Sequence, residues 1–118
     1  MSRPATRRHL ALVTLVGLLV VQLVALYVPQ SPGPPSPVPH GDKLVHALVF
    51  GAPVLVAGLA LRRWWRSVTL VCAAHAPVSE VIQHVALSGR SGEVWDVVAD
   101  LVGIGVALTG VGWAPRRP

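Results

Sequence analysis

Residues 94–113 read VWDVVADLVGIGVALTGVGW, an apolar run that is interrupted near its start by two aspartates. A 20-residue α-helix rises about 30 Å, which matches the hydrocarbon core of a bilayer. An ionisable side chain at the bilayer centre costs about 2.5 to 3.5 kcal/mol, so Asp96 and Asp100 need a specific explanation. They lie four residues apart and therefore share one face of the expected helix. This stretch predicts a transmembrane helix with a polar stripe near one end.

Three further stretches are apolar over a similar length, at residues 10–28, 44–61 and 68–87. The chain has 118 residues, of which 53% are hydrophobic and only 13% are charged, and its mean hydropathy is +0.60. This composition is far from that of a soluble globular domain. We therefore expect an all-α fold, an integral membrane bundle of four transmembrane helices.

Two of these spans have alternative interpretations. The first follows three arginines, as a cleaved signal peptide does, but its apolar run is long and the following LYVPQ has no small-x-small cleavage site. The third contains HAPVSEVIQH, which is polar enough for an amphipathic helix lying in the membrane interface. We favour an uncleaved first span and a third span that crosses.

The basic residues predict the orientation, because cytoplasmic flanks collect Lys and Arg. Eight of the ten lie before the first span, between the second and third, or after the fourth: Arg3, Arg7, Arg8, Arg62, Arg63, Arg66, Arg116 and Arg117. The other side holds only Lys43 and Arg90. We expect a multi-pass protein of the bacterial plasma membrane with both termini cytoplasmic. Its parts are a basic N-terminus (1–9), a membrane domain (10–113) with a Pro-rich outer loop (29–42), and a cytoplasmic tail (114–118).

The net charge of +5 and the isoelectric point near 11.2 are also typical of nucleic-acid-binding proteins. The positive-inside distribution accounts for this charge, so we expect no nucleic-acid partner. The single cysteine, Cys72, lies within the third span and is expected to be a small buried apolar residue. No Walker, Rossmann, zinc-finger or nucleophile-elbow motif is present, and the sequence defines no cofactor.

The polar residues of the last three spans lie at similar depth, near the expected outer face. Each span contributes one helical face, because its members are three or four residues apart. Arg90 lies in the short outer loop between the last two spans. Small residues spaced by four, Ala47 with Gly51 and Ala99 with Gly103 and Ala107, predict close helix packing. The candidate ligand-binding residues are Asp42, His46, Glu80, Gln83, Arg90, Asp96 and Asp100.

Four motifs in order, DKxxHxxxF from Asp42, ExxQ from Glu80, the loop Arg90, and DxxxDxxG from Asp96, resemble the VanZ-like membrane protein family. The family usually has Asn where this chain has Asp100, and often Pro where it has Gly89. The family is named for a protein associated with resistance to teicoplanin, a glycopeptide antibiotic that carries a fatty acyl chain. The resemblance therefore implies a membrane protein of the cell envelope, with a possible link to antibiotic resistance.

Three functions are compatible with these residues. The first is binding of a membrane lipid, a lipid-linked cell-wall precursor or a lipoglycopeptide, with Arg90 contacting phosphate and Gln83 supplying a neutral donor and acceptor. The second is a membrane enzyme acting on a lipid phosphate, with His46 as general base beside Glu80 and a divalent cation held by carboxylates. The third is an ion-pair network, including Lys43, that only fixes helix register. The sequence identifies neither a reaction nor an oligomeric state.

Overall fold

The computed structural model describes residues 2–29, 39–87 and 93–113. Most of the Pro-rich loop predicted at 29–42, the loop arginine Arg90 and the tail 114–118 lie outside these residues. Four helices make up the described chain: α1 (Arg3–Tyr27), α2 (Gly41–Ala60), α3 (Trp65–Ala86) and α4 (Val94–Trp113). The all-α class predicted from the sequence is confirmed for this part of the chain.

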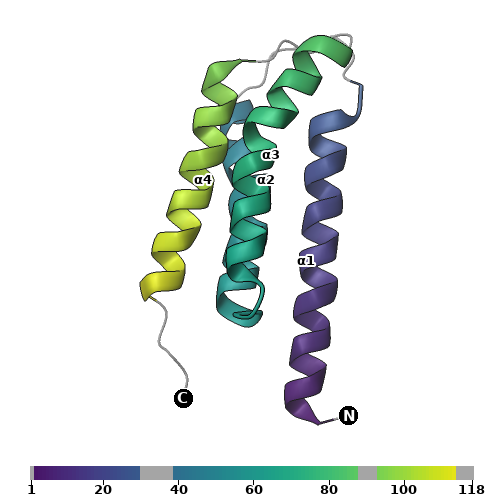
Figure 1. The fold of residues 1–118 in the computed structure, drawn as a ribbon, viewed down its shortest axis with the longest axis vertical. Coiled ribbons are helices and arrows are strands. Elements are labelled where there is room, and N and C mark those ends of the chain that lie inside the picture. Colours follow the sequence, from purple (N-terminus) through teal and green to yellow (C-terminus); the bar gives the residue numbers. More distant parts are fainter. Residues whose placement is uncertain (1, 30–38, 88–92, 114–118) are drawn as a thin grey trace.

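The four helices lie side by side with alternating direction (Figure 1). The beginning of α1, the connection between α2 and α3, and the end of α4 lie at one end of the bundle (Figure 1). We call it the basic end, since it carries Arg3, Arg7, Arg8, Arg62, Arg63 and Arg66. The opposite end, which we call the polar end, contains the beginnings of α2 and α4 and the end of α3.

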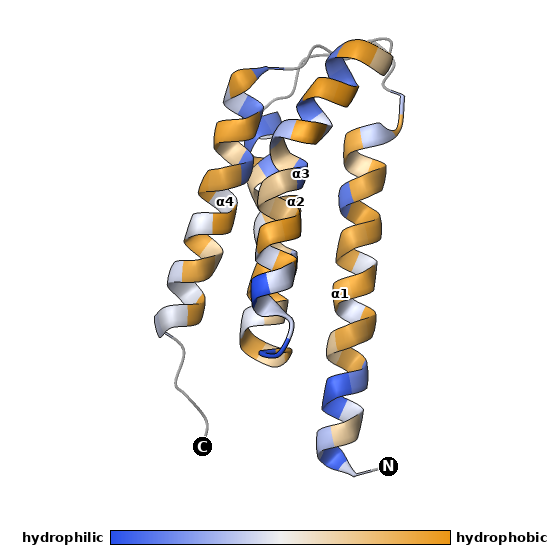
Figure 2. Ribbon diagram, in the orientation of Figure 1, coloured by the Kyte–Doolittle hydropathy of each residue, from blue (hydrophilic) through white to orange (hydrophobic). Residues whose placement is uncertain are grey.

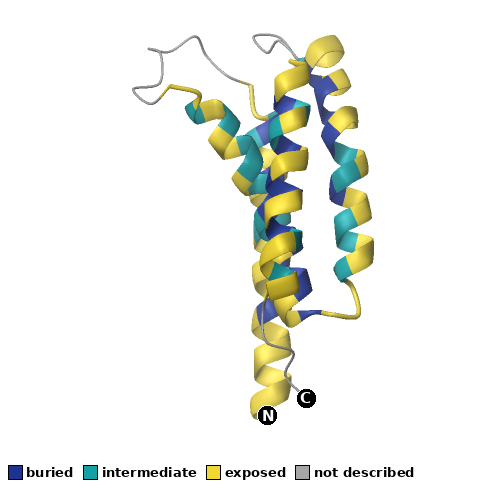
Figure 3. Cartoon of the chain, turned by 90° about the vertical axis from the view of Figure 1, so that its left-hand side faces the viewer, coloured by how far each residue is buried: buried dark blue, intermediate teal, exposed yellow. Residues whose placement is uncertain are grey.

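Hydrophobic residues run along all four helices (Figure 2), and many of them are exposed on the outside of the bundle. Val13 on α1, Leu44 on α2 and Val106 on α4 are 57%, 58% and 67% exposed. Buried residues line the inward faces of the helices (Figure 3). By length and composition, α1, α2 and α4 can cross a membrane, and α3 is not among them. A chain with this much exposed apolar surface is compatible with a membrane protein.

Small residues allow α2 and α4 to approach closely. A Cβ atom added to Gly103 would overlap the backbone of Ala47, and one added to Gly51 would lie 2.7 Å from the carbonyl oxygen of Gly103. The prediction of close packing at Ala47, Gly51 and Gly103 is confirmed. Because the backbones touch here, the side chains on either side of this crossing are held in a fixed register.

A hydrogen-bonded chain of side chains joins α1 to its neighbours. Gln22 Nε2 donates to the carbonyl oxygen of Val49 on α2 at 2.8 Å, and Gln22 Oε1 lies 2.9 Å from His75 Nδ1 on α3. Since an amide oxygen only accepts, His75 Nδ1 must carry the proton. His75 Nε2 then accepts from the Tyr27 hydroxyl at 2.6 Å. These hydrogen bonds connect α1 directly to α2 and α3.

The hydrophobic core next to these hydrogen-bonded side chains is formed by buried apolar side chains of all four helices. It consists of Leu26, Phe50, Val54, Cys72, Ala76, Ile104 and Ala107. Cys72 is 1% exposed, so its predicted role as a small buried residue is confirmed. Pro77 lies inside α3, and the axis of that helix turns between its lower and upper halves (Figure 1). A proline inside a helix is a common cause of such a bend.

Candidate functional site

Lys43 is the centre of an ion-pair network at the polar end. Its Nζ lies 2.8 Å from Asp42 Oδ2 and 2.9 Å from Glu93 Oε2, and it also pairs with Asp96 Oδ1. The Asp42 and Glu93 side chains are 64% and 53% exposed, whereas that of Asp96 is 11% exposed. Three carboxylates around one ammonium give this network, which forms the rim of the polar end, two formal negative charges more than positive ones. Ion pairs thus connect the first turn of α2 to the first turn of α4.

A second, deeper group lies below this rim. His46 Nδ1 is 2.8 Å from Asp100 Oδ1, and the Asp100 side chain is fully buried. His46 Nε2 lies 3.8 Å from Asp96 Oδ2. Glu80 comes from α3, and its Oε2 accepts a hydrogen bond of 2.8 Å from the backbone N–H of Glu93. Three helices therefore contribute ionisable side chains to one buried site.

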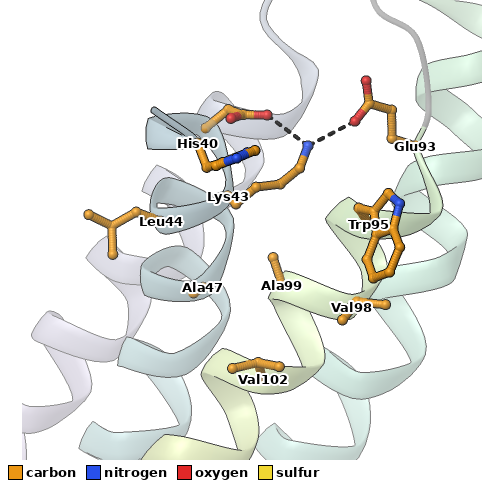
Figure 4. Close-up of a pocket in the computed structure, with 10 residues that line it drawn as sticks. His40, Lys43, Leu44, Ala47, Glu93, Trp95, Val98, Ala99 and Val102 are labelled. Carbon is orange, nitrogen blue, oxygen red and sulfur yellow. Dashed lines mark hydrogen bonds and ion pairs between the residues drawn. The ribbon is translucent and has the colours of Figure 1, made fainter. Parts of the chain in front are cut away.

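A groove of about 740 Å³ opens between α2 and α4 beside this site. Its upper rim is polar, with Lys43 and Glu93 joined across it (Figure 4). Its lower part is apolar, with Ala47 and Val102 facing it from opposite helices (Figure 4). The described residues that line it are His40, Asp42, Lys43, Leu44, Ala47, Glu93, Trp95, Val98, Ala99 and Val102. Leu44, Trp95 and Val102 are 58%, 69% and 56% exposed, so the groove opens to the surroundings of the bundle.

The structure brings together five of the seven candidate residues: Asp42, His46, Glu80, Asp96 and Asp100. Gln83 lies on the same face of α3, but its amide donates to the carbonyl oxygen of Leu26 on α1 at 2.8 Å. The sixth ionisable candidate, Arg90, is outside the described residues. His75 on α3 does not join the site, and contacts α1 as described above.

Sequence reasoning missed Glu93. It pairs with Lys43 through its carboxylate and contacts Glu80 through its backbone, and thereby joins α2, α3 and α4. The available signal was its spacing from Asp96, because an acidic residue three positions earlier lies close to the same helical face. Glu93 was missed because it lies just before the predicted span at residues 94–113 and not within it.

Comparisons with known protein families, with curated proteins and with solved structures find no match for this chain. The class of protein is therefore defined by its fold and site alone. The described part of the chain is a four-helix bundle whose outer surfaces are largely apolar. It has a buried site of ionisable side chains at one end, and a groove beside that site opens to the surroundings.

Proposed function

We propose that this chain is a VanZ-like integral membrane protein that binds a lipid or a lipid-linked cell-envelope molecule in the groove between α2 and α4. The observation that carries the proposal is the order of the groove lining, which is polar at the rim and apolar below it. A lipid has the same order, with a polar head and an apolar chain. A groove that opens along the apolar surface of a bundle can admit such a molecule sideways from the bilayer.

The charges at the rim favour a head group with both charge signs or many hydroxyls. Lys43 can contact a phosphate, and the exposed carboxylates of Asp42 and Glu93 can accept hydrogen bonds from amines or sugar hydroxyls. A simple anionic lipid suits this rim less well, since the rim carries more negative than positive charge. Sugar phosphates and amino groups are typical of lipid-linked cell-wall precursors, and a lipoglycopeptide of the teicoplanin type has amines, sugars and an acyl chain. A link to resistance would follow from binding such a molecule.

We further propose that all four helices cross the membrane and that the polar end faces outward. The support is the concentration of arginines at the basic end, which the positive-inside rule assigns to the cytoplasm. The polar faces of α3 turn inward, since Glu80 is 7% and Gln83 is 3% exposed, and this lowers the cost of placing α3 in lipid. Hydrogen bonds between α1 and its neighbours α2 and α3 support an uncleaved first span.

A second candidate function, a membrane enzyme acting on a lipid phosphate, is favoured by the pair of His46 and Asp100. A buried carboxylate that bonds to one ring nitrogen orients an imidazole as a general base. However, neither His46 nor Asp100 lines the groove, and a general base must reach the proton it abstracts. Binding is therefore the function that the geometry supports better.

The groove can be tested by filling it. Val102 and Val106 lie one turn apart on α4 and are 56% and 67% exposed, but only Val102 lines the groove. We expect Val102→Phe to reduce the amount of co-purified lipid at least about tenfold, because a phenyl ring occupies the space of an acyl chain; tenfold corresponds to about 1.4 kcal/mol. Native mass spectrometry of gently solubilised protein measures the retained lipid.

Val106→Phe is the matched control, with the same substitution on the same helix, and it should retain lipid like the wild type. Equal retention by both variants would contradict binding in the groove. Circular dichroism and size-exclusion chromatography establish that both variants are folded before the spectra are compared.

A further inference from the structure

Three side chains from three helices form a compact group below the rim: His46 on α2, Glu80 on α3 and Asp100 on α4. One potential ligand atom from each lies within 4.8 Å of the other two. The Asp100 side chain is fully buried and that of His46 is 12% exposed, while Glu80 is 7% exposed. The group therefore combines one imidazole and two carboxylates in a buried position.

Two oxygens of this group have no hydrogen-bond partner among the described residues. They are Glu80 Oε1 and Asp100 Oδ2, and both are buried. The second oxygen of each carboxylate is bonded, Glu80 Oε2 to the backbone of Glu93 and Asp100 Oδ1 to His46. A buried polar atom without a partner is costly, so these two oxygens indicate that the site takes up a further positive group.

We propose that His46, Glu80 and Asp100 bind one divalent transition-metal cation, of the Zn²⁺ or Mn²⁺ type. Imidazole nitrogen suits Zn²⁺, and carboxylate oxygen suits both Zn²⁺ and Mn²⁺. Two ionised carboxylates and a neutral imidazole carry two negative charges, which one divalent cation balances. Three protein ligands would leave a coordination position open, as in catalytic metal sites.

The geometry needs only a small adjustment to hold the ion. With ligands at about 2.1 Å in a tetrahedral arrangement, neighbouring ligand atoms are about 3.4 Å apart. The ligand atoms, which lie within 4.8 Å of one another, would therefore change their separations by at most about 1.4 Å. Glu80 can supply most of this movement, since it has more rotatable bonds than the other two. Asp96 Oδ2, 3.8 Å from His46 Nε2, is placed to interact with the ligated imidazole or with a bound water.

This inference goes beyond lipid binding, because none of the three residues lines the groove. The test uses the full-length protein with its affinity tag removed, purified in mild detergent, stripped with a chelator and dialysed against Zn²⁺ or Mn²⁺. Inductively coupled plasma mass spectrometry then gives the metal content per chain. We expect about one tightly held ion per wild-type chain, and at least a tenfold weaker affinity in Asp100→Asn and in Glu80→Gln.

Asp42→Asn is the matched control, because it removes a carboxylate that is 64% exposed and lies outside the group. It should hold metal like the wild type. The proposal is overturned if folded wild-type protein holds neither ion, if Asp100→Asn and Glu80→Gln keep the wild-type affinity, or if Asp42→Asn loses metal to the same extent as they do. Lipid retention of the wild type, Asp100→Asn and Glu80→Gln, measured on the same samples, separates a failure of this metal site from a failure of the groove.

Discussion

A Gly103→Leu variant is expected to lose most of its stability, because the α2–α4 crossing has no room for a side chain at this position. A Cβ atom at Gly103 already overlaps the backbone of Ala47, and backbone cannot rotate away as a flexible side chain can. Overpacking of a filled interior costs about 1 to 3 kcal/mol and sometimes more. Since the leucine would force two helices apart, we expect about 3 kcal/mol or more.

The matched control for this variant is Gly105→Leu on the same helix. A Cβ atom at Gly105 meets nothing within 4 Å, so this change should alter stability by less than about 0.5 kcal/mol. Unfolding in mixed micelles with increasing sodium dodecyl sulfate, followed by circular dichroism, measures both. Equal unfolding midpoints for the two variants would show that α2 and α4 do not pack through Gly103.

A His46→Leu variant is the second change with a large expected effect. The leucine removes the only described partner of Asp100, whose side chain is fully buried. Breaking a buried charged pair by removing one member costs about 3 to 5 kcal/mol, because the remaining charge is uncompensated. The same micelle unfolding assay, carried out on metal-free protein, should detect this loss.

A double-mutant cycle with Asp100→Asn isolates the contribution of the pair. In the Asp100→Asn background, His46→Leu should cost about 2 kcal/mol less than in the wild type, since no carboxylate is left without its partner. Additive effects of the two substitutions would mean that His46 and Asp100 do not interact.

Much of the architecture follows from periodicity and residue size. Apolar runs of about 20 residues predict the helices. The small residues Ala47, Gly51 and Gly103 predict the close contact of α2 and α4, because only small side chains let helix backbones touch. The convergence of His46, Glu80 and Asp100 also follows, once three helices are aligned with their polar faces at one depth.

Other parts of the site depend on packing that a pattern does not specify. Gln22 is a single polar residue in an apolar run, and its amide bonds to both α2 and α3. Gln83 shares the face of Glu80 but bonds to α1, since a long side chain can turn to either neighbour. Glu93 joined the network because its backbone N–H lies within hydrogen-bonding distance of Glu80 on α3. These contacts depend on helix rotation and on loop paths, which a residue pattern does not determine.

Site-specific photo-cross-linking in intact bacterial membranes tests the central claim, that an outward-facing groove selects a lipid-linked envelope molecule. A photoreactive phenylalanine analogue replaces Trp95, which lines the groove, or Trp113, which is 86% exposed at the other end of α4. Mass spectrometry identifies the captured lipids. We predict that position 95 captures a lipid-linked envelope molecule, enriched over its abundance in the membrane, and that position 113 captures bulk phospholipid. The same bulk phospholipids at both positions would contradict selective binding, and capture of the envelope molecule only at position 113 would contradict the proposed orientation.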